Sequence, residues 1–192
     1  MNNNKSVIVG VLMASIVVSS CGGGSSSGGT AGDSAEVEAE NTTEVITASE
    51  IFLNAFNDFS CSPGWTNRNS GLGRAAYSGS GTCKASFPGE SGAYSVFLLA
   101  QTEFDGSSPY AVSINGNNIK EGRYPYSTGS LKCDCPEPWR EHCPDRVVTI
   151  SAGTHEINNG DSIGFFGDDV YPCGDDSHGS YAKWRGMRFV KQ

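Results

Sequence analysis

The chain has 192 residues, a formal net charge of −8, 7 Cys and 25 Gly. This length fits one domain with a terminal extension. The acidic balance disfavours binding to nucleic acid or to an anionic lipid surface, because both need clustered basic side chains. The 3 Trp, 7 Tyr and 9 Phe residues argue against a wholly disordered chain.

The first twenty residues have the pattern of a signal peptide. Lys5 precedes an apolar run from Val7 to Val18, which would be about 18 Å long as a helix and too short for a bilayer core of about 30 Å. The segment Val18-Ser19-Ser20-Cys21 resembles the lipobox of bacterial lipoproteins. That resemblance implies cleavage before Cys21 and acylation of its thiol, and Gly22 favours the outer membrane. The alternative is an ordinary signal peptide with a chance Cys.

Residues 21–45 are rich in Gly, Ser and Glu and lack hydrophobic periodicity, which predicts a flexible tether. Every aromatic residue lies at or beyond Phe52. The predicted organisation is therefore a lipoprotein signal peptide at 1–20, a lipidated and disordered tether at 21–45, and a folded domain at 46–192.

The domain has the pattern of short strands separated by turns rich in Gly, Pro and Asn. Residues 48–58 could instead form a helix. Asn115-Gly116 predicts a type I′ hairpin turn, and Trp184 is expected in the core. Short strands with Gly-rich turns predict an all-β sandwich or barrel. The predicted strands, in chain order, are 50–56, 82–87, 93–100, 110–114, 147–151, 162–167 and 181–190.

Three segments together resemble one family. They are Gly92 to Val96, Pro109 to Gly116, and Ile157 to Ile163. They are similar to the strand and turn skeleton of galactose-binding-like β-sandwich modules, which include many non-catalytic carbohydrate-binding modules. The resemblance covers about residues 90–190 and implies a single β-sandwich with a jelly-roll-like topology.

That resemblance also implies a structural calcium held by the first and last strands of the domain. Glu50 matches the first-strand position. The last strand offers Lys183, Arg185 and Arg188 and no acidic residue.

Six Cys remain once Cys21 is set aside, and an even number in an exported protein predicts three disulfides. Cys61 with Cys83 is the first expected pair, because it closes a local loop. The other four would tie the 131–145 loop to itself and to the 170s. In an extended chain Cys133 and Cys135 would point the same way but lie too far apart to form a disulfide with each other. The remaining two are Cys143 and Cys173. A zinc site that also uses His142 is the less favoured alternative, because thiolates do not persist in an oxidising compartment.

Two loops carry residue types that suit a sugar. Aromatic faces stack on the C–H faces of sugars, and carboxylates and imidazoles hydrogen-bond to hydroxyls. The alternatives are that the acids form Asx turns and that Trp139 plugs the loop onto the core. The expected stacking residues are Tyr171, Trp139 and Trp65, and the expected hydroxyl partners are Asp169, Asp175, Asp176 and His178. Oxygen ligands at Asp175 and Asp176 would also suit a calcium ion.

The sequence thus predicts a lipid-anchored, monomeric, extracytoplasmic module that binds a polysaccharide or oligosaccharide without catalysis. One alternative is a metal-assisted hydrolase or lyase acting on carbohydrate, which would use His178 with Asp175 or Asp176, or His142 with Asp145. No Gly-x-Ser-x-Gly or His-Glu-x-x-His motif is present. A second alternative is a surface adhesion lipoprotein that binds another protein.

Overall fold

The computed structural model describes residues 49–135, 143–174 and 179–192. These residues belong to the second of two compact units into which the chain divides, residues 48–192. None of them forms a helix long and apolar enough to cross a membrane. The strands are β1 (Glu50–Asn54), β2 (Ser60–Cys61), β3 (Trp65–Arg68), β4 (Gly71–Arg74), β5 (Gly81–Ser86), β6 (Gly92–Thr102), β7 (Pro109–Ile114), β8 (Asn117–Arg123), β9 (Arg146–Ile157), β10 (Ser162–Gly167) and β11 (Trp184–Lys191).

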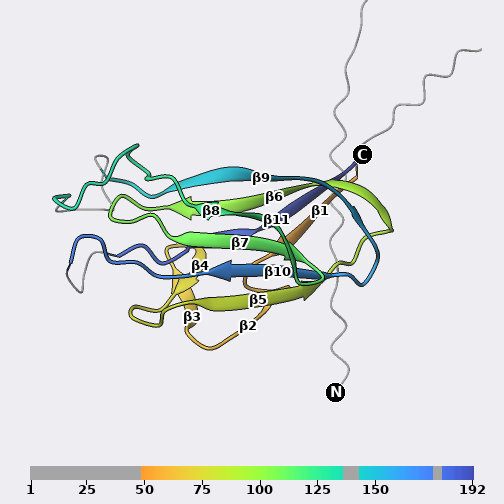
Figure 1. Cartoon of the computed structure of the whole chain (residues 1–192), viewed down its shortest axis with the longest axis horizontal. Helices are drawn as coiled ribbons and strands as arrows, with labels where there is room; N and C mark the ends of the chain where they lie inside the picture. The colour runs from red at the N-terminus through yellow and green to blue at the C-terminus, as the bar shows by residue number, and fades with distance from the viewer. Residues whose placement is uncertain (1–48, 136–142, 175–178) are drawn as a thin grey trace, which may run out of the picture. The chain divides into compact units, whose positions relative to one another are not determined.

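The strands form two antiparallel sheets (Figure 1). Sheet A has the order β3-β4-β11-β6-β9, and β1 also pairs with β11. Sheet B has the order β2-β5-β10-β7-β8. The predicted all-β sandwich is confirmed.

The core lies between the two sheets, because alternate side chains of the strands point inward. In β5, for example, Cys83 and Ala85 are buried while Thr82 and Lys84 are exposed. The prediction that Trp184 lies in the core is also confirmed: its side chain is fully buried.

Aromatic packing fixes the centre of this core. The Trp184 ring stacks on Phe165 from sheet B, with 4.1 Å between ring centroids. Phe59 meets the same indole edge-on at 4.8 Å. Such pairs add specificity to the burial of apolar area.

Residues 49–58, the described part of the segment 48–58, do not form a helix. Strand β1 ends at Asn54, and the next residues turn back, because the Asn54 side chain accepts from the Phe56 N–H at 2.9 Å and Asp58 Oδ2 accepts from the Asn54 N–H at 2.7 Å. Such local side-chain bonds favour a turn over a helix.

The last strand begins at Trp184 and not at Tyr181 as expected. Backbone donors ahead of it go to side chains instead of a neighbouring strand: the Tyr181 N–H donates to Glu103 and the Ala182 N–H to Ser108. Ala182 also has a φ of 49°, which is incompatible with an extended strand.

Two tight hairpins join neighbouring strands. Asn115 and Gly116, with φ of 51° and 82°, connect β7 to β8, which confirms the predicted turn. Asn69 and Ser70, with φ of 50° and 68°, connect β3 to β4. Positive φ at both central residues is typical of a type I′ turn.

The predicted disulfides are confirmed. Cys61 pairs with Cys83, directly opposite each other on β2 and β5. Cys133 pairs with Cys173, and Cys135 with Cys143. The 131–145 loop is therefore tied both to itself and to the 170s, as expected.

The two ends of the sandwich differ. Glu50 enters sheet A opposite Val190, near the C-terminus, whereas the other end of β11 is Trp184. These two points on β11 lie about 20 Å apart, at 3.3 Å per residue. At the Trp184 end lie the β3–β4 hairpin, the start of β9, and the two segments that the Cys133–Cys173 disulfide joins (Figure 1).

Candidate functional site

A polar cleft of about 930 Å³ opens at the Trp184 end of the sandwich. We call it the end cleft. The β3–β4 hairpin, the end of β6, the residues just before β9 and the segment before β11 all contribute to its walls. Its lining includes the polar and aromatic side chains of Arg68, Gln101, Glu103, Asp145, Tyr181 and Lys183.

Sheet topology brings these residues together. In sheet A the central strand β6 runs antiparallel to both β9 and β11. The residues that follow the end of β6, such as Glu103, therefore lie beside the residues that precede β9 and β11, Asp145 and Lys183. Groups some 40 residues apart in sequence meet in one wall because of this strand order.

The wall contains a buried ion-pair cluster. Lys183 Nζ donates to the Asp145 carboxylate and lies 3.4 Å from Glu103 Oε2. The side chains of Lys183 and Glu103 are only 4% and 5% exposed. Gln101 Nε2 also donates to Asp145 Oδ2 at 3.2 Å. One ammonium group therefore faces two carboxyl groups.

This arrangement changes the acidity of Glu103. Burial raises the pKa of Glu103 to about 8, against the opposing effects of Lys183 and of the Tyr181 N–H, which donates to Oε1 at 2.9 Å. The Lys183 charge compensates only partly, because its close hydrogen bond is to Asp145. Glu103 therefore takes up a proton when the chain folds near neutral pH.

We expect Glu103→Gln to change how stability depends on pH. The pKa of Glu103 is about 8 in the folded protein against an ordinary value of 4.5, so its stabilising contribution is complete below about pH 4.5 and is lost as the pH rises through about 8. The unfolding free energy of the wild type should accordingly fall relative to that of the variant between about pH 4.5 and 8. Urea unfolding of both proteins measures this difference, and a constant difference across the range would contradict the assignment.

The open side of the end cleft carries hydrogen-bonding groups. The Arg68 guanidinium lies 3.6 Å from the centroid of the Tyr181 ring, and its Nε donates to the Arg74 carbonyl. Asn67 and Asn69 beside it are exposed. Amides and a stacked guanidinium offer donors and acceptors in fixed positions.

A row of three tyrosines leads outward from the cleft. The Tyr181 ring, in the cleft wall, meets Tyr171 edge-on with 6.1 Å between centroids. Tyr171 in turn stacks on Tyr77 at 4.4 Å and 12°. Tyr77 is 59% exposed, the highest fraction among the large hydrophobic side chains described. The row thus ends in an exposed aromatic side chain.

Hydrogen bonds fix the middle of this row. The Tyr171 hydroxyl accepts from the Tyr77 N–H at 2.6 Å and donates to Asp169 Oδ2 at 2.8 Å. Burial raises the pKa of Tyr171 far above its ordinary value, so the hydroxyl keeps its proton. Gly179 packs so closely that a Cβ there would meet the Tyr171 ring at 2.5 Å. Tyr171 therefore serves as a support for Tyr77.

Buried Arg74 holds the loop that presents Tyr77. Its guanidinium donates to the carbonyls of Pro63, Ser78 and Gly79 at 3.1, 3.0 and 2.7 Å. Its side chain is 1% exposed and lies against the Trp65 ring. Charge-assisted bonds to three carbonyls give this loop a defined shape without regular structure.

The structure places three of the seven expected ligand residues. Tyr171 and Asp169 lie in the tyrosine row, next to the end cleft. Trp65 is half-buried and packs against the core beside Phe165. Contacts of Tyr171, Asp169 and Trp65 with a ligand stay predictions. The other four, Trp139, Asp175, Asp176 and His178, lie outside the described residues, as does His142.

Sequence reasoning missed Tyr77, Arg68 and the Glu103–Asp145–Lys183 cluster. Tyr77 follows Ala75-Ala76 in a loop with no ligand-like pattern. Its one signal is that an aromatic residue stands in a segment rich in Gly and Ser. The cluster leaves no local signal, because its members come from three separate parts of the chain.

The strands implied to hold a structural calcium do not fit that ion. Glu50 and Arg188 face each other, with 3.7 Å between Oε2 and Nη1, and a guanidinium cannot coordinate a cation. Among the residues that the structure describes, no group of three or more His, Cys, Asp and Glu could hold a metal ion. The calcium position at Asp175 and Asp176 lies outside them.

No protein-family profile and no curated protein matches the chain. Among solved structures it is similar to a family 35 carbohydrate-binding module from Clostridium thermocellum, with 14% identity over 76% of this chain and 100% of that chain and a TM-score of 0.45. It is also similar to the CBM36-1 domain of a multidomain xylanase from the hindgut metagenome of Trinervitermes trinervoides (14% identity, 73% and 96% covered, TM-score 0.46). An exo-β-1,3-galactanase from Phanerochaete chrysosporium is similar over 74% of this chain and 29% of its own length, with 16% identity and a TM-score of 0.41.

Proposed function

We propose that this protein binds carbohydrate at the end cleft and performs no chemistry on it. The observation that carries the proposal is the tyrosine row, which links an exposed, rigidly held aromatic side chain to a cleft lined with amide, guanidinium and carboxyl groups. Sugars present C–H faces and hydroxyls together, and this site offers partners for both. Tyr77 would stack on a sugar ring, while Asn67, Asn69 and Arg68 would bind hydroxyls.

The cluster in the cleft wall fits a binding role better than a catalytic one. Asp145 already accepts from Lys183 and Gln101, and Glu103 accepts from Tyr181. Groups held in this way present a fixed polar wall. A fixed wall lowers the entropy lost on binding, because the side chains are already ordered.

The proposal extends to where the protein works. The lipobox-like segment ending at Cys21 would anchor the chain to the outer membrane, and the tether would join the domain at Glu50. That residue lies at the end of sheet A opposite the end cleft. The end cleft would then lie at the other end of the sandwich from the residue at which the domain begins.

We expect Tyr77→Ala to weaken carbohydrate binding by about 1–3 kcal/mol, or about 5- to 150-fold in Kd, because it removes the exposed stacking face. Phe52→Ala is the matched control, since Phe52 is an exposed aromatic on β1 of sheet A. Titration calorimetry with the best ligand of a polysaccharide panel measures both. Equal affinity of wild type and Tyr77→Ala would refute the assignment of Tyr77.

A further inference from the structure

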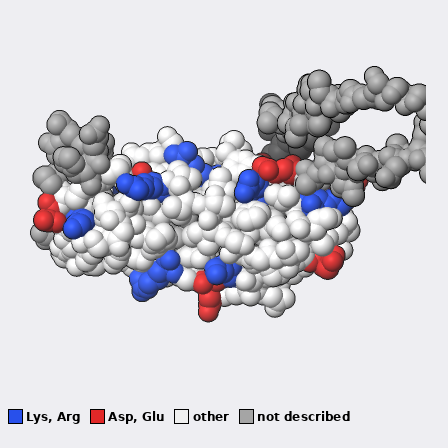
Figure 2. Space-filling model, turned by 90° about the horizontal axis from the view of Figure 1, so that it is seen from above, with Lys and Arg blue, Asp and Glu red and all other residues white. Residues whose placement is uncertain are grey.

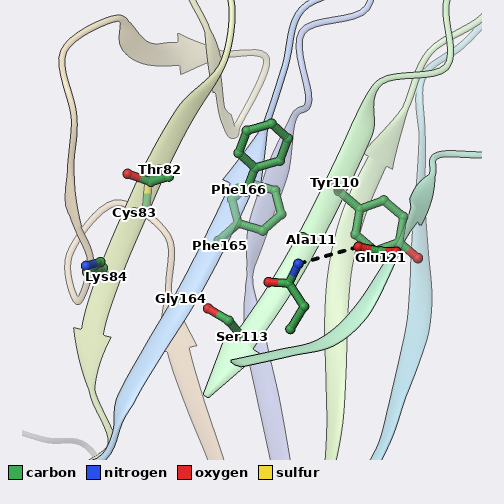
Figure 3. A pocket seen from close by; sticks show the side chains of 11 residues that line it. Thr82, Cys83, Lys84, Tyr110, Ala111, Ser113, Glu121, Gly164, Phe165 and Phe166 are labelled. Carbon is green, nitrogen blue, oxygen red and sulfur yellow. Dashed lines mark hydrogen bonds between the residues drawn. The ribbon is translucent and has the colours of Figure 1, made fainter. Parts of the chain in front are cut away.

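A second hollow lies on the outward face of sheet B (Figure 3). It shares no lining residue with the end cleft. Its volume is about 420 Å³. Thr82 and Lys84 of β5 stand on one side, and Tyr110 and Glu121 stand on the other. We call it the sheet groove.

Small side chains create this hollow. Gly164 lies in the middle of β10, between Lys84 on one neighbouring strand and Ser113 on the other. The Ser113 hydroxyl leans over it, so that a Cβ at Gly164 would meet Ser113 Oγ at 2.2 Å. Ala111, also on the outward face, adds only a methyl group. A register irregularity between Val112 and Ser113 in the β7–β8 pairing bends the sheet at this point.

The groove continues across the sheet. A further hollow of about 290 Å³ adjoins it and shares Lys84 with it. This second part is lined by Asp58 and by the hydroxyls of Ser60, Ser86 and Ser162. The two hollows together extend from β8 across the sheet to β2, a form suited to an extended chain and not to a single small ring.

The chemistry of this surface selects the kind of chain. Half-exposed Phe166 is the one phenyl ring on its outward face. Hydroxyl-bearing residues and the Asn118 amide, which donates to Glu121, line the rest of the groove, and its one cation, Lys84, is accompanied by two carboxylates, Glu121 and Asp58. A single cation cannot hold a phosphate backbone, and a protein interface would be richer in aromatic side chains, Met and Arg. An uncharged ligand with many hydroxyls and one apolar face per unit fits.

The face of the molecule seen from above, which is not the face of the groove, also lacks a patch of one charge (Figure 2). On the face of the molecule shown in Figure 2, basic and acidic side chains are interspersed and much of the surface carries no charge. No field of one sign on that face would draw a charged polymer.

We propose that the sheet groove is a second binding site, which holds a neutral polysaccharide chain lying across the strands of sheet B, with Phe166 stacked on one sugar unit. The choice of carbohydrate as the ligand class rests on the proposed function. The location of the site does not, because the sheet groove shares no residue with the end cleft. A long polymer engages both sites and gains avidity, whereas a short oligosaccharide occupies them independently.

The test uses the full chain and four variants. Phe166→Ala removes the ring, and Ala111→Arg fills the floor with a long side chain that points away from the core. Tyr77→Ala reports on the end cleft. Thr149→Arg, an exposed position on β9 of sheet A, is the control for an added arginine. Affinity electrophoresis through neutral β-glucan, galactan, mannan and xylan gives polymer binding, and calorimetry with the matching hexasaccharide gives the number of sites. A thermal melt confirms that each variant is folded.

We expect two hexasaccharide sites in the wild type and one in Phe166→Ala and in Ala111→Arg, with polymer affinity at least tenfold lower in both and unchanged in Thr149→Arg. If Tyr77→Ala binds normally while both groove variants lose binding, carbohydrate binding at the sheet groove is supported and carbohydrate binding at the end cleft is refuted. If the groove variants behave as wild type while Tyr77→Ala loses binding, the groove is refuted and the proposed function stands. If the wild type binds none of the four polymers, both are refuted.

Discussion

Replacing Cys61 and Cys83 together by Ala is expected to lower the free energy of unfolding by about 3 kcal/mol. The bridge spans 22 residues, and a cross-link over a loop of this size removes that much conformational freedom from the unfolded chain. Cys83 is fully buried and Cys61 packs against the core, so the variant also loses close packing. A drop of roughly 10 °C in Tm should follow.

The matched control changes the neighbouring pair on the same two strands. Ser60 and Lys84 are exposed and lie opposite each other, one position from the bridge. Replacing both by Ala leaves the covalent link intact and should change the stability far less. Chemical denaturation of the three proteins compares them. Equal loss in both variants would mean that the bridge itself adds nothing.

Replacing Lys183 by Met is expected to cost about 3–5 kcal/mol near pH 8, because it leaves buried carboxyl groups without their cation. Lys183 is 4% exposed and holds Asp145 and Glu103 in the wall of the end cleft. The loss should be smaller near pH 5. At that pH Glu103, whose pKa is raised to about 8, carries a proton and has less need of a cation.

Lys191→Met is the control, because the ion pair that Lys191 forms with Glu90 is open to solvent. Water compensates for such a charge, so little change is expected. Adding Glu103→Gln and Asp145→Asn to Lys183→Met should restore much of the stability, since the three positions of the cluster then carry no charge. Failure of this rescue would contradict the view that unpaired charge causes the loss, and would favour lost packing instead.

Much of the fold follows from local patterns. Strand β6 is predictable from its long apolar run. Strands β5 and β7 are predictable because inward-facing and outward-facing residues alternate along them with a period of two. β8 was missed because it is exposed along almost its whole length and has no alternation to show. β4 was missed because Gly71 and Gly73 lower strand propensity.

The disulfide framework and the site differ in how far the sequence predicts them. Cysteine number and spacing limited the bridges to a few arrangements. The end cleft depends on which strands lie side by side, and no local pattern reveals that β6 stands between β9 and β11. The aromatic and acidic residues of its loop pointed to Tyr171 as a ligand residue, and its contact with a ligand stays a prediction. Tyr77, 94 residues away along the chain, joins it only through tertiary packing.

The most direct test of the central claim is affinity electrophoresis of the purified, oxidised protein through gels containing a panel of polysaccharides, with Tyr77→Ala and Phe52→Ala run alongside. Carbohydrate binding at the end cleft predicts that at least one polysaccharide retards the wild type and Phe52→Ala equally, and that Tyr77→Ala is retarded much less. Unretarded migration of the wild type in every gel would contradict the proposed function. Equal retardation of all three proteins would show that the sugar binds away from the tyrosine row.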